Sequence, residues 1–174
     1  RARMLSYPEL AAIRLGYGLS PLCAPPTDPV ALVESVASAG PDGDAVSMAR
    51  DYLPHRSRFA DLNRQGAQQD PEALEAVRET MRGIGRRAPR IRIARAVGDG
   101  GFGERLVQFW ADHFTVSAGN LFDSVSAAAF VDEAIRPHLT GRFADLMFAA
   151  ETHPRMITYL DQVISVGPNS RAGK

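Results

Sequence analysis

The sequence has almost no cysteine, almost no lysine and no long hydrophobic run. Cys23 is the single cysteine among 174 residues, which excludes an internal disulfide framework and a zinc site built from cysteines. No apolar segment approaches the roughly 18 residues that a membrane-spanning helix needs. The first ten residues lack the apolar run of a signal peptide, so we expect a soluble, cytoplasmic protein, although the true start of the protein can lie upstream of Arg1.

Net charge is also missing, because twenty basic residues balance twenty acidic ones. This balance removes the global field that is typical of nucleic-acid-binding proteins and of polybasic membrane proteins. All the basic residues except Lys174 are arginines, which is typical of a GC-rich coding sequence. The composition therefore predicts a globular domain, and we treat residues 1–174 as a single one.

What the sequence does contain is helical periodicity. Aspartate followed by proline at Asp28 and Asp70 predicts an N-cap and a first-turn proline for two helices. Together with apolar residues at spacings of three and four, these signals predict an all-α, irregular fold of about seven helices without a sheet. The predicted helices cover residues 8–17, 29–40, 71–84, 104–114, 123–137, 141–151 and 154–164.

Two segments are less regular. In residues 41–69, glycine, aspartate, glutamine and arginine outnumber large apolar residues, so we expect a weakly structured connection with a short helix. In residues 89–97, Ile91 and Ile93 alternate with arginines as they would in a strand. The spacing of the apolar residues therefore does not decide between a helix and a strand.

The bulkiest helical stripe surrounds His113, and we expect it to face the core. The stripe consists of Leu106, Phe109, Trp110, His113 and Phe114. His113 is then either a core residue that donates to a carbonyl, or a metal ligand or general base that a carboxylate from another helix orients. His138 and His153 can join it, but their spacing matches no metal-binding signature.

Tyr159 and Asp161 are further candidates, since they flank Leu160 and face away from its apolar stripe. Polar groups at these positions face either water or a cleft. The residue pattern identifies no cofactor and no metal, and it leaves the small-molecule substrate unknown.

Two other motifs have weaker functional interpretations. Gly98, Gly100 and Gly103 match the G-x-G-x-x-G pattern, but no second strand with an acidic end follows, so a flexible connection between helices is favoured over dinucleotide binding. Seven arginines between residues 78 and 95 accompany one acid, Glu79. These arginines either form a solvated face, cover the acidic side of another segment, or bind phosphate or nucleic acid. The lack of aromatic residues between them disfavours nucleic acid.

Three blocks resemble a known family, the bacterial domain of unknown function 1800 family. They are residues 14–21, residues 104–114 with Trp110 and His113, and residues 153–161. The resemblance implies that this chain is the N-terminal portion of a longer protein, whose missing C-terminal segment packs on the Trp110/His113 helix. The family often has a second histidine where this chain has Ala111, which counts against a two-histidine metal site on that turn.

Two functional hypotheses follow. The first is a hydrolase-like or metal-assisted enzyme, with His113 as base or ligand and with Asp161 and Tyr159 at the edge of the cleft. The alternative is a non-catalytic interaction domain, whose arginine-rich face docks an acidic protein partner.

Overall fold

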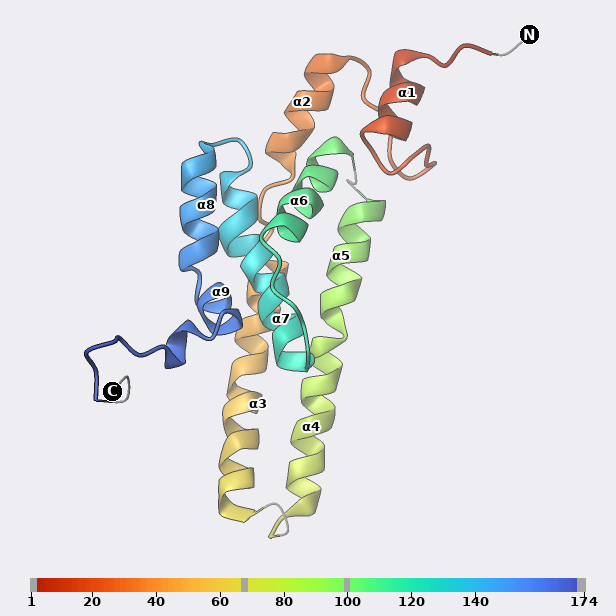
Figure 1. The fold of residues 1–174 in the computed structure, drawn as a ribbon. Helices are drawn as coiled ribbons and strands as arrows, with labels where there is room; N and C mark the ends of the chain where they lie inside the picture. Colours follow the sequence, from red (N-terminus) through yellow and green to blue (C-terminus); the bar gives the residue numbers. More distant parts are fainter. Residues whose placement is uncertain (1–2, 67–68, 99–100, 172–174) are drawn as a thin grey trace.

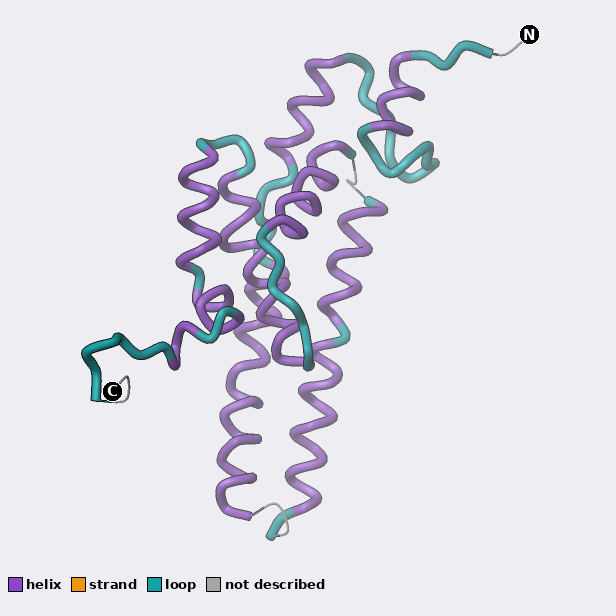
Figure 2. The backbone as a smooth tube through the Cα atoms, viewed as in Figure 1, coloured by secondary structure: helices purple, strands orange, loops and turns teal. Residues whose placement is uncertain are grey.

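A computed structural model describes residues 3–66, 69–98 and 101–171, which form helices joined by loops (Figures 1 and 2). No strand occurs in these ranges, where an isolated bridge pairs Ser20 with Cys23, and the all-α prediction is confirmed. None of the helices in the described ranges is long and apolar enough to cross a membrane. The elements are α1 (Tyr7–Arg14), α2 (Pro29–Ser38), α3 (Asp44–Gly66), α4 (Pro71–Gly85), α5 (Arg87–Val97), α6 (Phe102–His113), α7 (Leu121–Phe130), the π-helix η1 (Val131–Ile135), the 3-10 helix η2 (Arg136–His138), α8 (Phe143–Thr152), α9 (Pro154–Tyr159) and the 3-10 helix η3 (Gln162–Ile164).

The predicted helix starts at the two Asp-Pro pairs are confirmed. The Asp28 carboxylate accepts from the backbone N–H groups of Val30 and Ala31, and the Asp70 carboxylate accepts from that of Ala73. Each aspartate satisfies N–H groups that the first helical turn leaves without a partner.

The expectation of a weakly structured connection over residues 41–69 is wrong. This stretch contains α3, which runs antiparallel to α4 as a long helical hairpin (Figure 1). Its large apolar residues are few, but Ala45, Met48, Tyr52 and Leu62 repeat at helical spacing and are buried. The correct spacing of a few buried residues is sufficient here because α4, α5 and α7 pack against them.

The second ambiguous segment, residues 89–97, is helical and belongs to α5. The single helix expected over residues 123–137 begins at Leu121 and changes at Val131 into a π-helical turn and then a 3-10 turn. The helix expected over residues 154–164 ends at Tyr159, because Asp161 adopts a left-handed backbone conformation with φ of 55°.

The expected core stripe on α6 is confirmed only in part: Phe114 is buried and Trp110 packs against the core, but Phe109 and His113 do not. Val107 and Glu104 are buried, whereas Phe109 is 57% exposed and His113 is exposed. The reason lies at Gly103, where a Cβ atom would overlap the Ser35 carbonyl oxygen of α2. This close backbone approach places the Gly103 face of α6 against α2 and turns much of the aromatic stripe outward.

The core consists of two apolar clusters on either side of α7. The first cluster contains Phe114, Phe130, Ala134, Ile135, Leu146, Ala150 and Met156. The second contains Met48, Tyr52, Ala88 and Val125. Because α7 contributes to both clusters and η1 continues it into the first, this helical segment joins the α3–α4 hairpin to the C-terminal helices (Figure 1).

Candidate functional site

A cavity of about 540 Å³ lies between α3, α7 with η1, and α9. Most of its wall is apolar, and its polar side chains are those of Tyr52, Ser126, Glu133, His153, Arg155 and Thr158. Cavities of this size accommodate small organic molecules. The lining residues are Ala49, Tyr52, Leu53, Phe122, Val125, Ser126, Ala129, Glu133, His153, Pro154, Arg155 and Thr158.

A histidine and a glutamate meet at one end of this cavity. The Nε2 atom of His153 lies 3.0 Å from an Oε2 atom of Glu133, and the backbone N–H of Arg155 donates to His153 Nδ1 at 3.1 Å. Because Nδ1 accepts, the network assigns the imidazole proton to Nε2, which donates to the carboxylate. Both ring nitrogens are therefore engaged, and His153 positions Glu133, whose side chain is 46% exposed, rather than acting as a free base.

One buried polar atom of a lining residue, Arg155 Nε, has no hydrogen-bond partner among the described residues. The Arg155 side chain is 6% exposed, with Nη1 3.3 Å from Asp123 Oδ1 and Nη2 donating to the Ser117 carbonyl, but its buried Nε has no acceptor. Tyr52, which is 1% exposed, also lines the cavity. Burial raises the pKa of Tyr52, and the nearby charge of Arg56 opposes the rise.

These groups give the cavity a defined chemistry. Glu133 offers an acceptor, and Tyr52 contributes a hydroxyl group that donates or accepts. Leaving the buried Arg155 Nε donor unpaired costs about 1–3 kcal/mol. The site is suited to binding a largely apolar molecule with a few polar groups.

A buried ionic network lies next to the Glu133 end of the cavity. The Asp132 carboxylate, fully buried, lies 2.8 Å from Arg95 Nη1 and 3.1 Å from Arg136 Nε, and it accepts from the Ala45 backbone N–H. Arg136 also lies 2.9 Å from Glu104. Since Asp132 precedes Glu133 in the π-helical turn, the network fixes that turn against α3, α5 and α6.

Asp42 completes the network at its exposed end. Hydrogen bonds from the Arg95 guanidinium lower the pKa of the Asp42 carboxyl. Burial alone would lower the pKa of Arg95, but the hydrogen bonds with Asp42 and Asp132 outweigh burial and raise it.

His113, the leading residue from the sequence, lies outside this cavity. It is exposed at the end of α6, and its ring centroid lies 4.8 Å from that of Phe114 and 5.5 Å from that of Trp110. The interpretation of His113 as a core histidine is therefore wrong. Its catalytic or metal-binding role stays a prediction.

The other two predicted site residues do not meet His113. No hydrogen bond or ring contact joins His113 to Tyr159 or Asp161 within the described ranges. Tyr159 ends α9 and Asp161 lies in the following turn, both on the surface. Of the three histidines considered together, His153 lines the cavity and His113 and His138 do not.

The arginine run has more acidic partners than its own stretch of sequence suggests. Arg78, Arg82 and Arg86 pair with glutamates of α4, while Arg87 pairs with Asp51 and Arg95 with Asp42 and Asp132. The docking of an acidic protein partner stays a prediction, and it rests on the exposed Arg90 and Arg92 of α5.

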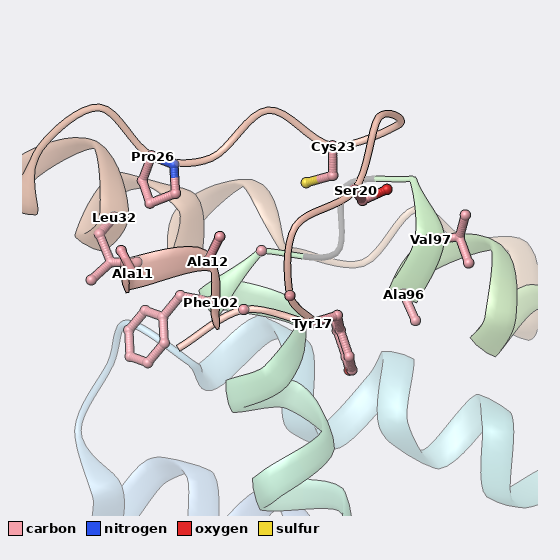
Figure 3. A pocket seen from close by; sticks show the side chains of 13 residues that line it. Ala11, Ala12, Tyr17, Ser20, Cys23, Pro26, Leu32, Ala96, Val97 and Phe102 are labelled. Carbon is pink, nitrogen blue, oxygen red and sulfur yellow. The ribbon is translucent and has the colours of Figure 1, made fainter. Parts of the chain in front are cut away.

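A second, smaller cavity of about 170 Å³ lies between the N-terminal segment, α2, α5 and α6 (Figure 3). Ala96 and Val97 border it on one side, and Ala11 and Leu32 on another. Cys23 lies on the loop that covers it. The glycine pattern from Gly98 to Gly103 runs beside this cavity, but residues 99–100 lie outside the described residues.

Metal-binding side chains do not gather in the described part of the chain, where no group of three or more histidine, cysteine, aspartate or glutamate residues is placed to hold a metal ion. Sequence reasoning missed Glu133, Arg155 and Tyr52, which come from three separate segments. The one local signal was the His153-Pro154 pair, whose histidine caps α9 through Nδ1.

Comparison with known proteins gives one match. A family model described as "Protein of unknown function (DUF1800)" matches residues 11–170. The chain significantly matches no curated protein and no solved structure. That the chain is bacterial and forms the N-terminal part of a longer protein stays a prediction.

Proposed function

The chain belongs to the DUF1800 family, whose description assigns no activity, and we propose that it binds a small organic molecule in the cavity between α3, α7 and α9. The observation that carries this proposal is the half-exposed Glu133 carboxylate on the wall of a largely apolar cavity of ligand size, which Arg155, whose buried Nε lacks a hydrogen-bond partner among the described residues, also lines. A largely apolar cavity with a few convergent polar groups is the usual form of a small-molecule site, and a buried polar atom without a partner beside it is rare.

The remaining contacts support the same proposal. Glu133 has one carboxylate oxygen held by His153, which leaves the other for a ligand. The side-chain hydroxyls of Ser126 and Thr158 donate to backbone carbonyls at 2.9 Å and 2.8 Å, so their lone pairs are available as acceptors. The ligand therefore has an apolar body and gains its orientation from Glu133, Tyr52 and Arg155.

Titration calorimetry with n-octanol tests this proposal, using Ala49→Phe to fill the cavity. Ala49 lines the cavity, and a phenyl ring there occupies the space that the octanol chain needs. We expect the unmodified protein to bind n-octanol and the variant to bind it at least tenfold more weakly, or about 1.4 kcal/mol.

Ala94→Phe is the matched control, because Ala94 is an exposed alanine of α5 that lines neither cavity. Equal binding by the Ala49→Phe, Ala94→Phe and unmodified proteins would contradict the proposal, as would no binding by any of them. If circular dichroism shows that Ala49→Phe is unfolded, Leu53→Trp narrows the cavity from a half-exposed position and takes its place.

A second candidate function is the hydrolase-like or metal-assisted enzyme with His113 as base or ligand. The observation in its favour is the exposed imidazole, whose ring stacks at 6.4 Å on Phe109 and which a substrate or metal ion can reach. Tyr159 and Asp161 would belong to the same site as His113 only if a further segment of the protein connected them. Phe109 and Phe143, both more than half exposed, are where we propose that a C-terminal segment of the same protein packs.

His113→Asn tests this second candidate. We expect calorimetry to show loss of Zn²⁺ binding while Tm changes by less than about 2 °C, because an exposed side chain contributes little to stability. Asp112→Asn, an exposed neighbour on another face of α6, should leave Zn²⁺ binding intact. A large fall in Tm, or unchanged Zn²⁺ binding, would remove His113 from the site.

A further inference from the structure

The cavity is elongated, and its direction follows from the pairing of α3 with α7. Near the start of α3, the Ala45 backbone N–H donates to Asp132 at 3.3 Å. Two turns later the Tyr52 ring lies 6.2 Å from Phe122. The two helical segments therefore run antiparallel, and the cavity extends along α7 and η1 from Phe122 to Glu133.

The lining residues of this segment recur at spacings of three and four. Phe122, Val125, Ser126, Ala129 and Glu133 form one face of the helical segment. At 1.5 Å per residue, Phe122 and Glu133 are separated by about 16 Å along the axis. A ligand that contacts both ends must be long and narrow.

Within the described ranges no arginine or lysine forms an ion pair with Glu133, whose carboxylate marks one end of the cavity. The neighbouring His153 contacts one Glu133 oxygen through Nε2, and its Nδ1 accepts from the Arg155 backbone N–H. The guanidinium of Arg155 is paired with Asp123. Glu133 is therefore the carboxylate on this wall whose charge a bound cation would balance.

A positive charge marks the opposite end. The guanidinium carbon of Arg56 lies 4.0 Å from the ring centroid of Phe122, and the Phe122 ring lines the cavity. In the part of the chain that the structure describes, no carboxylate forms an ion pair with Arg56. An exposed arginine held over an aromatic ring is available to an anionic group at the cavity mouth.

We infer that the ligand is a linear dipolar molecule, with an ammonium group at Glu133, an apolar chain along α7 and a carboxylate or other anionic group at Arg56. This inference rests on the proposed function of the same cavity and adds the chemical class of its ligand. The apolar middle of the cavity accepts methylene groups, and the opposite charges at its ends fix the direction of the chain.

Calorimetry with four ligands of one chain length tests the inference: ω-aminooctanoate, octylamine, octanoate and n-octanol, at low ionic strength. We expect ω-aminooctanoate to bind at least tenfold more tightly than n-octanol, with the two singly charged compounds between them. Glu133→Gln should remove the advantage of the two amines, and Arg56→Gln that of the two carboxylates.

Matched controls are Glu151→Gln on α8 and Arg58→Gln on α3, exposed residues that line neither cavity. Both should leave all four affinities unchanged. Equal affinities of all four ligands would contradict the dipolar class while leaving the proposed function intact. Failure of every ligand, including n-octanol, would instead contradict the proposed function itself.

Discussion

Asp132 is the residue on which the polar interior converges. Its carboxylate joins Arg95, Arg136 and the Ala45 backbone, so it connects α5, η1 and the start of α3. Burying a charged carboxylate costs desolvation free energy. The ion pairs and the hydrogen bond with its partners offset that cost. The neighbouring residue in the chain, Glu133, depends on the position of the same turn.

We therefore predict a large effect for Asp132→Asn. Without the carboxylate charge, two buried or half-buried guanidinium groups lose a counter-ion, at a cost of about 3 kcal/mol. For a chain of this length the loss lowers Tm by about 6–12 °C. Thermal unfolding followed by circular dichroism measures the change.

The control is Glu79→Gln, which removes an exposed partner of Arg82. Exposed pairs contribute about 0–1 kcal/mol, so Tm should fall by no more than about 4 °C. Similar Tm values for the two variants would show that the Asp132 network does not hold the turn.

At the scale of elements, α6 shows how one glycine sets the orientation of a helix. An added Cβ at Gly103 would overlap the Ser35 carbonyl oxygen and lie 2.9 Å from the Ala39 Cβ. Neither neighbour can move independently of the α2 backbone. The close approach buries Glu104 beside Arg136 and leaves Phe109 in solvent.

Gly103→Ala should accordingly destabilise the protein, by about 1–3 kcal/mol, because α2 and α6 must separate. Gly83→Ala is the matched change in α4, where an added Cβ meets no atom within 4 Å. There the loss of glycine flexibility should stabilise by about 0.5–1 kcal/mol. Urea unfolding measures both changes, and destabilisation by the two variants alike would contradict the packing argument.

Local signals in the sequence predict where several helices start, but not which face of each helix packs against its neighbours. Asp28 and Asp70 cap their helices as expected, since a cap depends only on residues within one turn. The orientation of α6 depends on Ser35, far away in the sequence, and no periodicity reports it. The long helix α3 was missed for the same reason, because its few apolar residues are sufficient only against α4 and α7.

At the scale of the whole molecule, the cavity belongs to no single segment. Its polar lining comes from three elements: Tyr52 from α3, Glu133 from η1 and Arg155 from α9. The packing of α3 against α7 and of α7 against α9 brings these residues to one cavity. Sequence reasoning selected His113 because its stripe was bulky, and the structure places that residue on the surface. Sites that form between distant elements require the fold before they can be located.

A titration of ¹⁵N-labelled protein with n-octanol, followed by two-dimensional NMR, tests the central claim most directly. If the molecule binds in the cavity between α3, α7 and α9, the largest shifts occur at amides of its walls, such as Ser126, Ala129 and Thr158, and Ala49→Phe suppresses them. Shifts confined to the exposed aromatic surface around Phe109 and Phe143, or no shifts at all, would contradict it.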